Sequence, residues 1–269
     1  MSEKRGIGMF SIYLSKALLY YCCFWAAVFG ACMGSFLNCA AWRIAHNESF
    51  LKGRSRCPVC GHVLGAPDLV PVFSWLFLRG RCRHCGARVS PRYVFTECAF
   101  AALTVLCLLR FDCSALCLRN YVFLCCLFCL SLVDLDCFLI PDGCLLLAAL
   151  VWLVTLPWTG DNAAAHILAG LGYGGATLAV SLVMDKVLKK ESLGGGDIKL
   201  FAVMGLYLGG IASLFALLFS CVLGLLFAAA TRSGKGKPFP FGPAISAACG
   251  VMLLYGQRLT AWYAGLLGM

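Results

Sequence analysis

Long apolar segments separated by short polar ones run along almost the whole chain. A transmembrane helix needs about 17 to 25 mostly apolar residues to cross roughly 30 Å of hydrocarbon. Candidate runs extend from about residues 18 to 42, 94 to 110, 116 to 133, 143 to 159, 165 to 184, 198 to 209, 211 to 230 and 243 to 262. The sixth run is short and predicts a half-span or a tilted helix. The pattern predicts an all-α polytopic membrane protein with about eight transmembrane helices.

Composition supports this prediction. Of the 269 residues, 61% are apolar and 13% are charged, and the mean hydropathy is +0.87. This number of charged residues is too small to cover the surface of a water-soluble globular protein. The composition therefore excludes a water-soluble globular protein. The first apolar run has no small-residue cleavage pattern, and we expect this span to be retained.

The formal net charge of +10 could suggest a nucleic-acid ligand, but the basic residues flank the apolar runs, where they set topology. We therefore expect membrane lipid and no nucleic acid as a partner. The predicted cytoplasmic side holds Arg43, Lys52, Arg54, Arg56, Arg79, Arg81, Arg83, Arg88, Arg92, Lys186, Lys189, Lys190, Lys199, Arg232, Lys235 and Lys237. The opposite side holds Lys4, Arg5, Lys16, Arg110, Arg119 and Arg258. This difference places both termini outside the cytoplasm.

One stretch, from about residue 43 to 93, has the composition of a loop, with four prolines and several glycines. We expect it to form a small cytoplasmic module. The chain then divides into a first transmembrane segment (1–42), this module (43–93) and a membrane-embedded domain of about seven helices (94–269).

The module contains two C-x2-C pairs separated by a gap of 21 residues, Cys57 with Cys60 and Cys82 with Cys85, and a glycine follows each pair. Two thiolates separated by two residues can bind one ion when the chain turns tightly, and two such turns complete a tetrahedron. The spacing predicts a structural zinc site, because four thiolates leave no open position. Four unbound cysteines or two disulfides are the alternatives, and a cytoplasmic location disfavours disulfides. Most other cysteines lie in apolar runs, where they act as small apolar residues.

Aspartates at the predicted cytoplasmic ends of helices are the second candidate site. Asp134, Asp136 and Asp142 cluster after the third run, while Asp197 follows Gly194-Gly195-Gly196 just before the sixth. Ionisable groups at a membrane boundary are functional candidates. The three glycines allow close approach of backbone, and Asp197 is expected to begin a helix.

Two neighbouring carboxyls share one proton, and such a pair can hydrolyse a peptide bond. One carboxylate takes a proton from water while the protonated partner donates to the carbonyl oxygen. The residues alone do not fix the partner of Asp197. Asp134 and Asp136 face nearly opposite directions on a helix, so only one can point inward. Pro141 should end any helix before Asp142, which could instead cap the next span.

These residues resemble the type IV prepilin peptidases, a family of aspartyl proteases with a GxGD motif. The resemblance covers roughly residues 30 to 240 and rests on the following segments: Gly34-Ser-Phe-Leu-Asn38, Pro71 to Cys82, Ser90-Pro91-Arg92-Tyr93 with Glu97, Asp134-Leu-Asp136 with Ile140-Pro141-Asp142, Gly194-Gly195-Gly196-Asp197-Ile198-Lys199, and Phe239-Pro240-Phe241-Gly242-Pro243. It implies that Asp134 and Asp197 form the catalytic dyad, with Gly194 and Gly196 as the motif glycines.

The resemblance also implies the activity and location. Such enzymes cut the leader peptides of type IV prepilins and of type II secretion pseudopilins at the cytoplasmic face of the bacterial inner membrane. Bifunctional members then methylate the new N-terminus with S-adenosyl-L-methionine, and the cysteine-bearing loop implies that this chain does so. The methyltransferase residues cannot be placed by motif, although Glu97 is a candidate for that site, for substrate binding, or for a buried ion pair with Arg92 or Arg43.

Three other functions would make different demands on the sequence. A presenilin-type intramembrane protease would have a Tyr-Asp pair, whereas Val133 precedes Asp134 here. An ion-coupled transporter would use the same aspartates to bind a cation or proton at a broken helix, but this function leaves the cysteine module unexplained. A non-enzymatic membrane scaffold would need neither aspartate.

Overall fold

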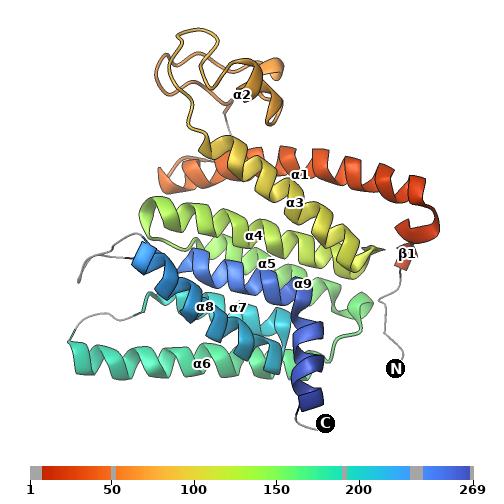
Figure 1. Cartoon of the computed structure of the whole chain (residues 1–269). Coiled ribbons are helices and arrows are strands. Elements are labelled where there is room, and N and C mark those ends of the chain that lie inside the picture. The colour runs from red at the N-terminus through yellow and green to blue at the C-terminus, as the bar shows by residue number, and fades with distance from the viewer. Residues whose placement is uncertain (1–7, 50–52, 190–192, 231–238, 267–269) are drawn as a thin grey trace. The chain divides into compact units, whose positions relative to one another are not determined.

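Helices make up most of the protein in the computed structural model (Figure 1), which describes residues 8–49, 53–189, 193–230 and 239–266. The chain divides into two compact units, Met9–Cys113 and Ser114–Met269 together with Met1–Gly8. Two short strands, β1 (Gly8–Phe10) and β2 (Cys113–Ser114), form a two-stranded sheet.

The unit Met9–Cys113 contains two long helices that pack side by side, α1 (Lys16–Ala45) and α3 (Arg92–Phe111). A 3-10 turn (Ile12–Leu14) precedes α1. A second 3-10 turn (Ala66–Asp68) and the short helix α2 (Phe73–Phe77) lie between the two long helices in the sequence.

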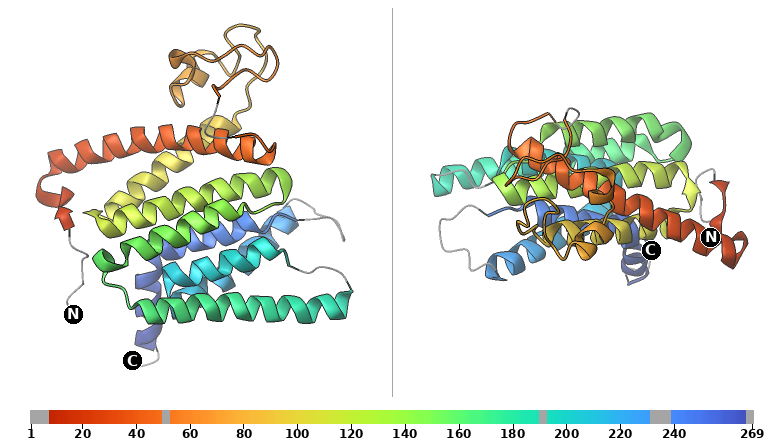
Figure 2. Two further views of the ribbon diagram at one scale, coloured as in Figure 1. Left: turned by 180° about the vertical axis from the view of Figure 1, so that it is seen from behind. Right: turned by 90° about the horizontal axis from the view of Figure 1, so that it is seen from above.

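The second unit contains six helices, α4 (Ala115–Cys137), α5 (Asp142–Thr159), α6 (Ala163–Leu188), α7 (Gly195–Leu208), α8 (Gly210–Ala230) and α9 (Gly242–Leu266). Helix α4 packs against α5 and α9, α7 packs against α5, α6 and α9, and α8 packs against α9 (Figure 2). The fully buried side chains of this unit include Phe123, Leu130, Met204, Ile245 and Met252. Helices α4, α7 and α9 therefore supply much of its core.

The helices lie where the apolar runs predicted them. In the part of the chain that the structure describes, six are long and apolar enough to cross a membrane, namely α1, α3, α4, α5, α6 and α8. Helix α7 has 14 residues and is about 21 Å long. This length is less than the roughly 30 Å thickness of the hydrocarbon core of a bilayer. Helix α9 is not among the six. A multi-pass membrane protein is thus supported, while the count of eight crossings stays a prediction.

Several basic residues used to predict orientation lie outside the described residues, namely Lys4, Arg5, Lys52, Lys190, Arg232, Lys235 and Lys237.

Local signals set the helix boundaries next to the predicted site. The Ser114 hydroxyl accepts the Cys117 N–H at 3.1 Å and caps the start of α4. Helix α4 ends at Cys137, and Phe138 caps it in a left-handed conformation with φ of 55°, donating its N–H to the Asp134 carbonyl. Pro141 then precedes α5, as expected from its restricted φ. Asp134 is therefore in the last turn of a helix.

Glycines let the helices approach closely where α6 meets α7. A Cβ added to Gly205 of α7 would lie 2.6 Å from the backbone of Gly170 in α6, and one added to Gly174 would lie 2.8 Å from the Ala202 Cβ. Small residues at such contacts are typical of membrane helices, whose association depends on close packing. This contact holds the position of α7, which carries Asp197.

Because of this contact, we predict that Gly205→Ala destabilises the protein. Glycine to alanine in a helix normally stabilises by up to about 1 kcal/mol, but here overpacking should cost about 1 to 3 kcal/mol. Unfolding of the purified protein in detergent measures the effect. The control is Gly172→Ala in α6, where an added Cβ meets nothing within 4 Å. Equal stabilities of the two variants would contradict the close contact.

Candidate functional site

The structure places Asp134 in the last turn of α4 with an exposure of only 5%. Its Oδ2 accepts the backbone N–H of Gly242, the first residue of α9, at 2.8 Å. A buried carboxylate needs such a donor, because an unpaired charge away from water is costly. The carboxyl group of Asp134 is thus fixed by a contact between residues 108 apart in the sequence.

Asp197 lies in the first turn of α7 and is partly buried. Its N–H donates to the Gly194 carbonyl at 3.0 Å, which closes the first turn after the glycines. Burial, and secondly the negative charge of Asp134, raise the pKa of Asp197 to about 7, against a smaller opposing effect of a hydrogen bond with the Gly194 backbone. The two carboxyls are therefore close enough to interact electrostatically, and a proton resides on Asp197 below about pH 7.

The other two predicted aspartates lie apart from this pair. Asp136 is exposed, as expected from its position two residues beyond Asp134 on the same helix. Asp142 begins α5 and forms an ion pair with Lys199, whose Nζ lies 2.8 Å from Oδ1. Both side chains are more than half exposed, so this pair contributes little to stability. It joins the first turns of α5 and α7.

Two of the three glycines before Asp197 lie close to neighbouring side chains. A Cβ on Gly194 would approach the Asp197 Oδ2 to 3.3 Å, and one on Gly196 would lie 2.8 Å from the Ile140 Cβ. A Cβ on Gly195 would meet nothing within 4 Å. The packing thus excludes a side chain at the third position, leaves little room at the first, and leaves the middle position open.

Gly242 is a residue of this site to which the sequence assigned no role. A Cβ there would lie 2.8 Å from the Asp134 Oδ2, so a side chain would disturb the hydrogen bond that fixes the carboxyl. The pair Gly242-Pro243 at the start of the last apolar run indicates where a helix begins, because proline favours the first turn of a helix. It gave no indication of contact with Asp134.

The four predicted cysteines come together in the unit Met9–Cys113. Their Sγ atoms all lie within 4.8 Å of one another, and those of Cys57 and Cys85 are 3.9 Å apart. A tetrahedral ion with metal–sulfur bonds of about 2.3 Å separates its sulfurs by about 3.8 Å. The cluster therefore has the dimensions of a four-thiolate metal site.

Two matching turns build this cluster. In the first, the Cys57 N–H donates to the His62 carbonyl and the Gly61 N–H to the Cys57 carbonyl, each at 2.9 Å. The second turn repeats the pattern at Cys82 and Gly86, and both glycines have φ of +69°. This left-handed conformation explains the glycine after each pair. Backbone N–H groups of Cys60 and Val59 lower the pKa of Cys57 to about 6, which favours the thiolate.

Two family models match the chain. Residues 28–111 match the bacterial Peptidase A24 N-terminal domain, and residues 121–229 match the type IV leader peptidase family. The second match includes both Asp134 and Asp197, and the first includes the four cysteines.

Curated relatives match over most of the chain. A prepilin leader peptidase/N-methyltransferase of Bacillus subtilis is 34% identical, with 88% of this chain and 95% of the relative covered. One from Dichelobacter nodosus is 30% identical over 88% and 92% of the two chains. A type 4 prepilin-like proteins leader peptide-processing enzyme of Escherichia coli is 33% identical over 87% and 94%. No solved structure gives a significant match.

The interaction between the two carboxyls predicts a specific titration. Asp197 should keep its proton up to about pH 7, because burial and the Asp134 charge both oppose ionisation. Infrared difference spectra between the wild type and Asp197→Asn should show a protonated carboxyl band that is lost as pH rises through about 7. In Asp134→Asn the band should disappear at lower pH, since the neighbouring charge is gone. A band lost at the same pH in both backgrounds would contradict the interaction.

Proposed function

This chain belongs to the type IV leader peptidase family, and we propose that Asp134 and Asp197 are the catalytic dyad with which it cleaves prepilin leader peptides. The protein is an aspartic peptidase with N-methyltransferase activity, as its relatives are named. The observation that carries the assignment is the electrostatic interaction of the two carboxyls, which adds to the effect of burial in raising the pKa of Asp197 to about 7. The alternative of an ion-coupled transporter has no support from the relatives.

In the proposed reaction, the ionised Asp134 takes a proton from a water molecule whose oxygen attacks the scissile carbonyl carbon. Asp197, which holds its proton near neutral pH, donates it to the carbonyl oxygen. The tetrahedral intermediate then collapses and its C–N bond breaks. The departing amine takes up the proton that Asp134 accepted, and a hydroxyl of the intermediate returns a proton to Asp197 as the new carboxyl group forms. The Gly242 N–H keeps the Asp134 carboxyl oriented for the first transfer.

The proposed substrates are type IV prepilins and the pseudopilins of type II secretion. For N-methylation, S-adenosyl-L-methionine would supply the methyl group to the amine that cleavage releases, leaving S-adenosyl-L-homocysteine and one proton. No residue is assigned to that transfer. The order of the two reactions follows from chemistry, because the N-terminal amine exists only after the leader is removed.

The proposed location is the bacterial inner membrane, with the dyad at the cytoplasmic face and about eight crossings. The excess of arginine and lysine in the connections of one parity supports this orientation. Asp134 at the end of α4 and Asp197 at the start of α7 then belong to the same face. The domain division proposed is a first span (1–42), a cytoplasmic module (43–93) and the membrane-embedded peptidase domain (94–269).

We further propose that Cys57, Cys60, Cys82 and Cys85 hold one structural zinc ion. The sulfur separations fit a tetrahedral four-thiolate site, and such a site leaves no position for substrate. The ion would stabilise a module that buries little apolar surface of its own. It would supply no catalytic chemistry.

The dyad predicts a large loss of activity on removal of either carboxyl. Asp134→Asn and Asp197→Asn should each lower cleavage of a prepilin by about 10²- to 10⁴-fold, because each removes a proton-transfer group. Mass spectrometry of the product, with and without S-adenosyl-L-methionine, reports the cleavage position and any added methyl group. Asp136→Asn is the matched control, since this exposed residue lies two positions from Asp134, and it should cleave as the wild type does. Normal cleavage by either dyad variant would remove that residue from the mechanism.

The zinc proposal predicts one ion per chain in protein purified without added metal. Cys82→Ser should lose the zinc and expose the module to proteolysis, because three remaining thiolates bind more weakly. Elemental analysis by mass spectrometry measures the metal. Cys98→Ser, at an exposed cysteine of α3, is the control and should keep it. Zinc-free wild-type protein with an intact module would contradict the proposal.

A further inference from the structure

The short helix α2 presents an apolar face that nothing in the described part of its unit covers. Phe73, Leu76 and Phe77 share one side of the helix and are 60%, 54% and 83% exposed, respectively. Phe73 and Phe77, with Val70, also line a shallow groove. Exposed apolar patches of this kind mark interaction surfaces.

A buried hydrogen bond fixes the level of α2 relative to α3. The Val72 N–H, just before α2, donates at 2.7 Å to the carboxyl of Glu97, which is 6% exposed. Glu97 lies five residues after Arg92, the first residue of α3. At a rise of 1.5 Å per residue, the two are separated by about 7.5 Å along the helix axis. Val72 has φ of 63°, an unfavourable value for a β-branched residue. The start of α2 is therefore held beside the first two turns of a membrane-spanning helix.

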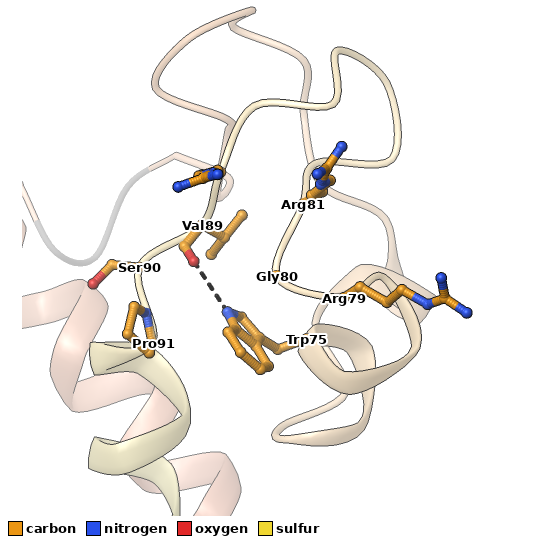
Figure 3. A pocket seen from close by; sticks show the side chains of 8 residues that line it. Trp75, Arg79, Gly80, Arg81, Val89, Ser90 and Pro91 are labelled. Carbon is orange, nitrogen blue, oxygen red and sulfur yellow. Dashed lines mark hydrogen bonds between the residues drawn. The ribbon is translucent and has the colours of Figure 1, made fainter.

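A second set of contacts ties α2 to the segment that enters α3. The Trp75 Nε1–H donates to the Val89 carbonyl at 3.1 Å (Figure 3). Gly80, with φ of +68°, packs against the Trp75 ring, where an added Cβ would lie 2.8 Å from a ring carbon. Trp75 thus faces the chain before α3, and Phe73, Leu76 and Phe77 remain exposed together on another side of this short helix.

The surroundings of this face are strongly basic. Residues 53 to 91 contain six arginines and a single acidic residue, Asp68. The exposed Arg79, Arg81 and Arg88 line a pocket with Trp75. Arg83, which pairs with Asp68, lies beside Phe73 and Phe77 in the groove. Aromatic rings next to arginines are characteristic of segments that sit at an anionic membrane surface.

We propose that the α2 face docks on the bilayer that α1 and α3 cross, with Phe73, Leu76 and Phe77 among the lipids and the arginines on anionic headgroup phosphates. The segment between α1 and α3 is joined at both ends to a helix that is long and apolar enough to span the membrane, so both of its ends stay near the membrane surface. The Glu97 contact places α2 at the depth where α3 enters, and the charge favours anionic lipid. The inference depends on the membrane location and not on the catalytic dyad.

The test uses the full chain in lipid nanodiscs, with the photocrosslinking amino acid p-benzoylphenylalanine in place of Phe77. The matched control carries it in place of Val59, another apolar residue of the module, which is 71% exposed in the first cysteine turn. After irradiation, peptide mass spectrometry should find lipid adducts at least about fivefold more often at position 77 than at position 59. Phosphatidylglycerol added to phosphatidylcholine should raise the yield at position 77 several-fold, because each basic residue near an anionic surface favours binding by about fivefold.

Equal lipid adducts at positions 77 and 59, or none at 77, would overturn the docking. A crosslink from position 77 to a second protein chain would overturn it in favour of a protein partner. A yield of lipid adducts that does not depend on phosphatidylglycerol would overturn the proposal that the arginines bind anionic headgroups. Zinc content checks that both variants remain folded, and prepilin cleavage in the same samples separates a failure of the dyad from a failure of docking.

Discussion

A carboxyl group at the end of an apolar helix must be hydrogen-bonded if it is to remain there, and the arrangement around Asp134 follows from this requirement. Its partner is the Gly242 N–H, which comes from the first residue of α9. The contact is possible because Gly242 has no side chain, and it joins the end of α4 to the start of α9. Since α9 also packs against α7, the same helix lies against both elements that carry the proposed dyad.

Asp197 depends on a different set of constraints. Gly196 admits Ile140 at a distance that a Cβ would not allow, so α7 can begin close to this side chain. A Cβ on Gly194 would crowd the Asp197 carboxyl at 3.3 Å. The close approach of Gly205 to Gly170 then holds α7 against α6. Helix α7 has only 14 residues, so its length does not set how deep its first turn lies in the membrane. Packing against neighbouring helices sets that depth instead.

Much of this could be predicted from the sequence, because the signals are local. Long apolar runs predicted eight helices at the observed places, and Pro141 correctly predicted the break before Asp142. Helical periodicity predicted that only one of Asp134 and Asp136 points inward, and the structure buries Asp134. The spacing of the cysteine pairs predicted their cluster.

The contacts that were not predicted join residues far apart in the chain. The hydrogen bonds from Gly242 to Asp134 and from Val72 to Glu97, and the ion pair of Asp142 with Lys199, leave no trace in local composition or periodicity. In the sequence Lys199 served only to predict orientation, and its ion pair with Asp142 was not foreseen. Such pairs depend on the packing of helices, which a single sequence does not specify.

The most direct test of the central claim is an experimental structure of the chain with a prepilin peptide whose scissile bond cannot be hydrolysed. The account predicts that the carboxyls of Asp134 and Asp197 both lie within about 3 Å of the scissile carbonyl oxygen or of one water molecule beside it. A peptide bound with its scissile bond remote from either carboxyl, or the two acids at opposite faces of the membrane, would contradict it.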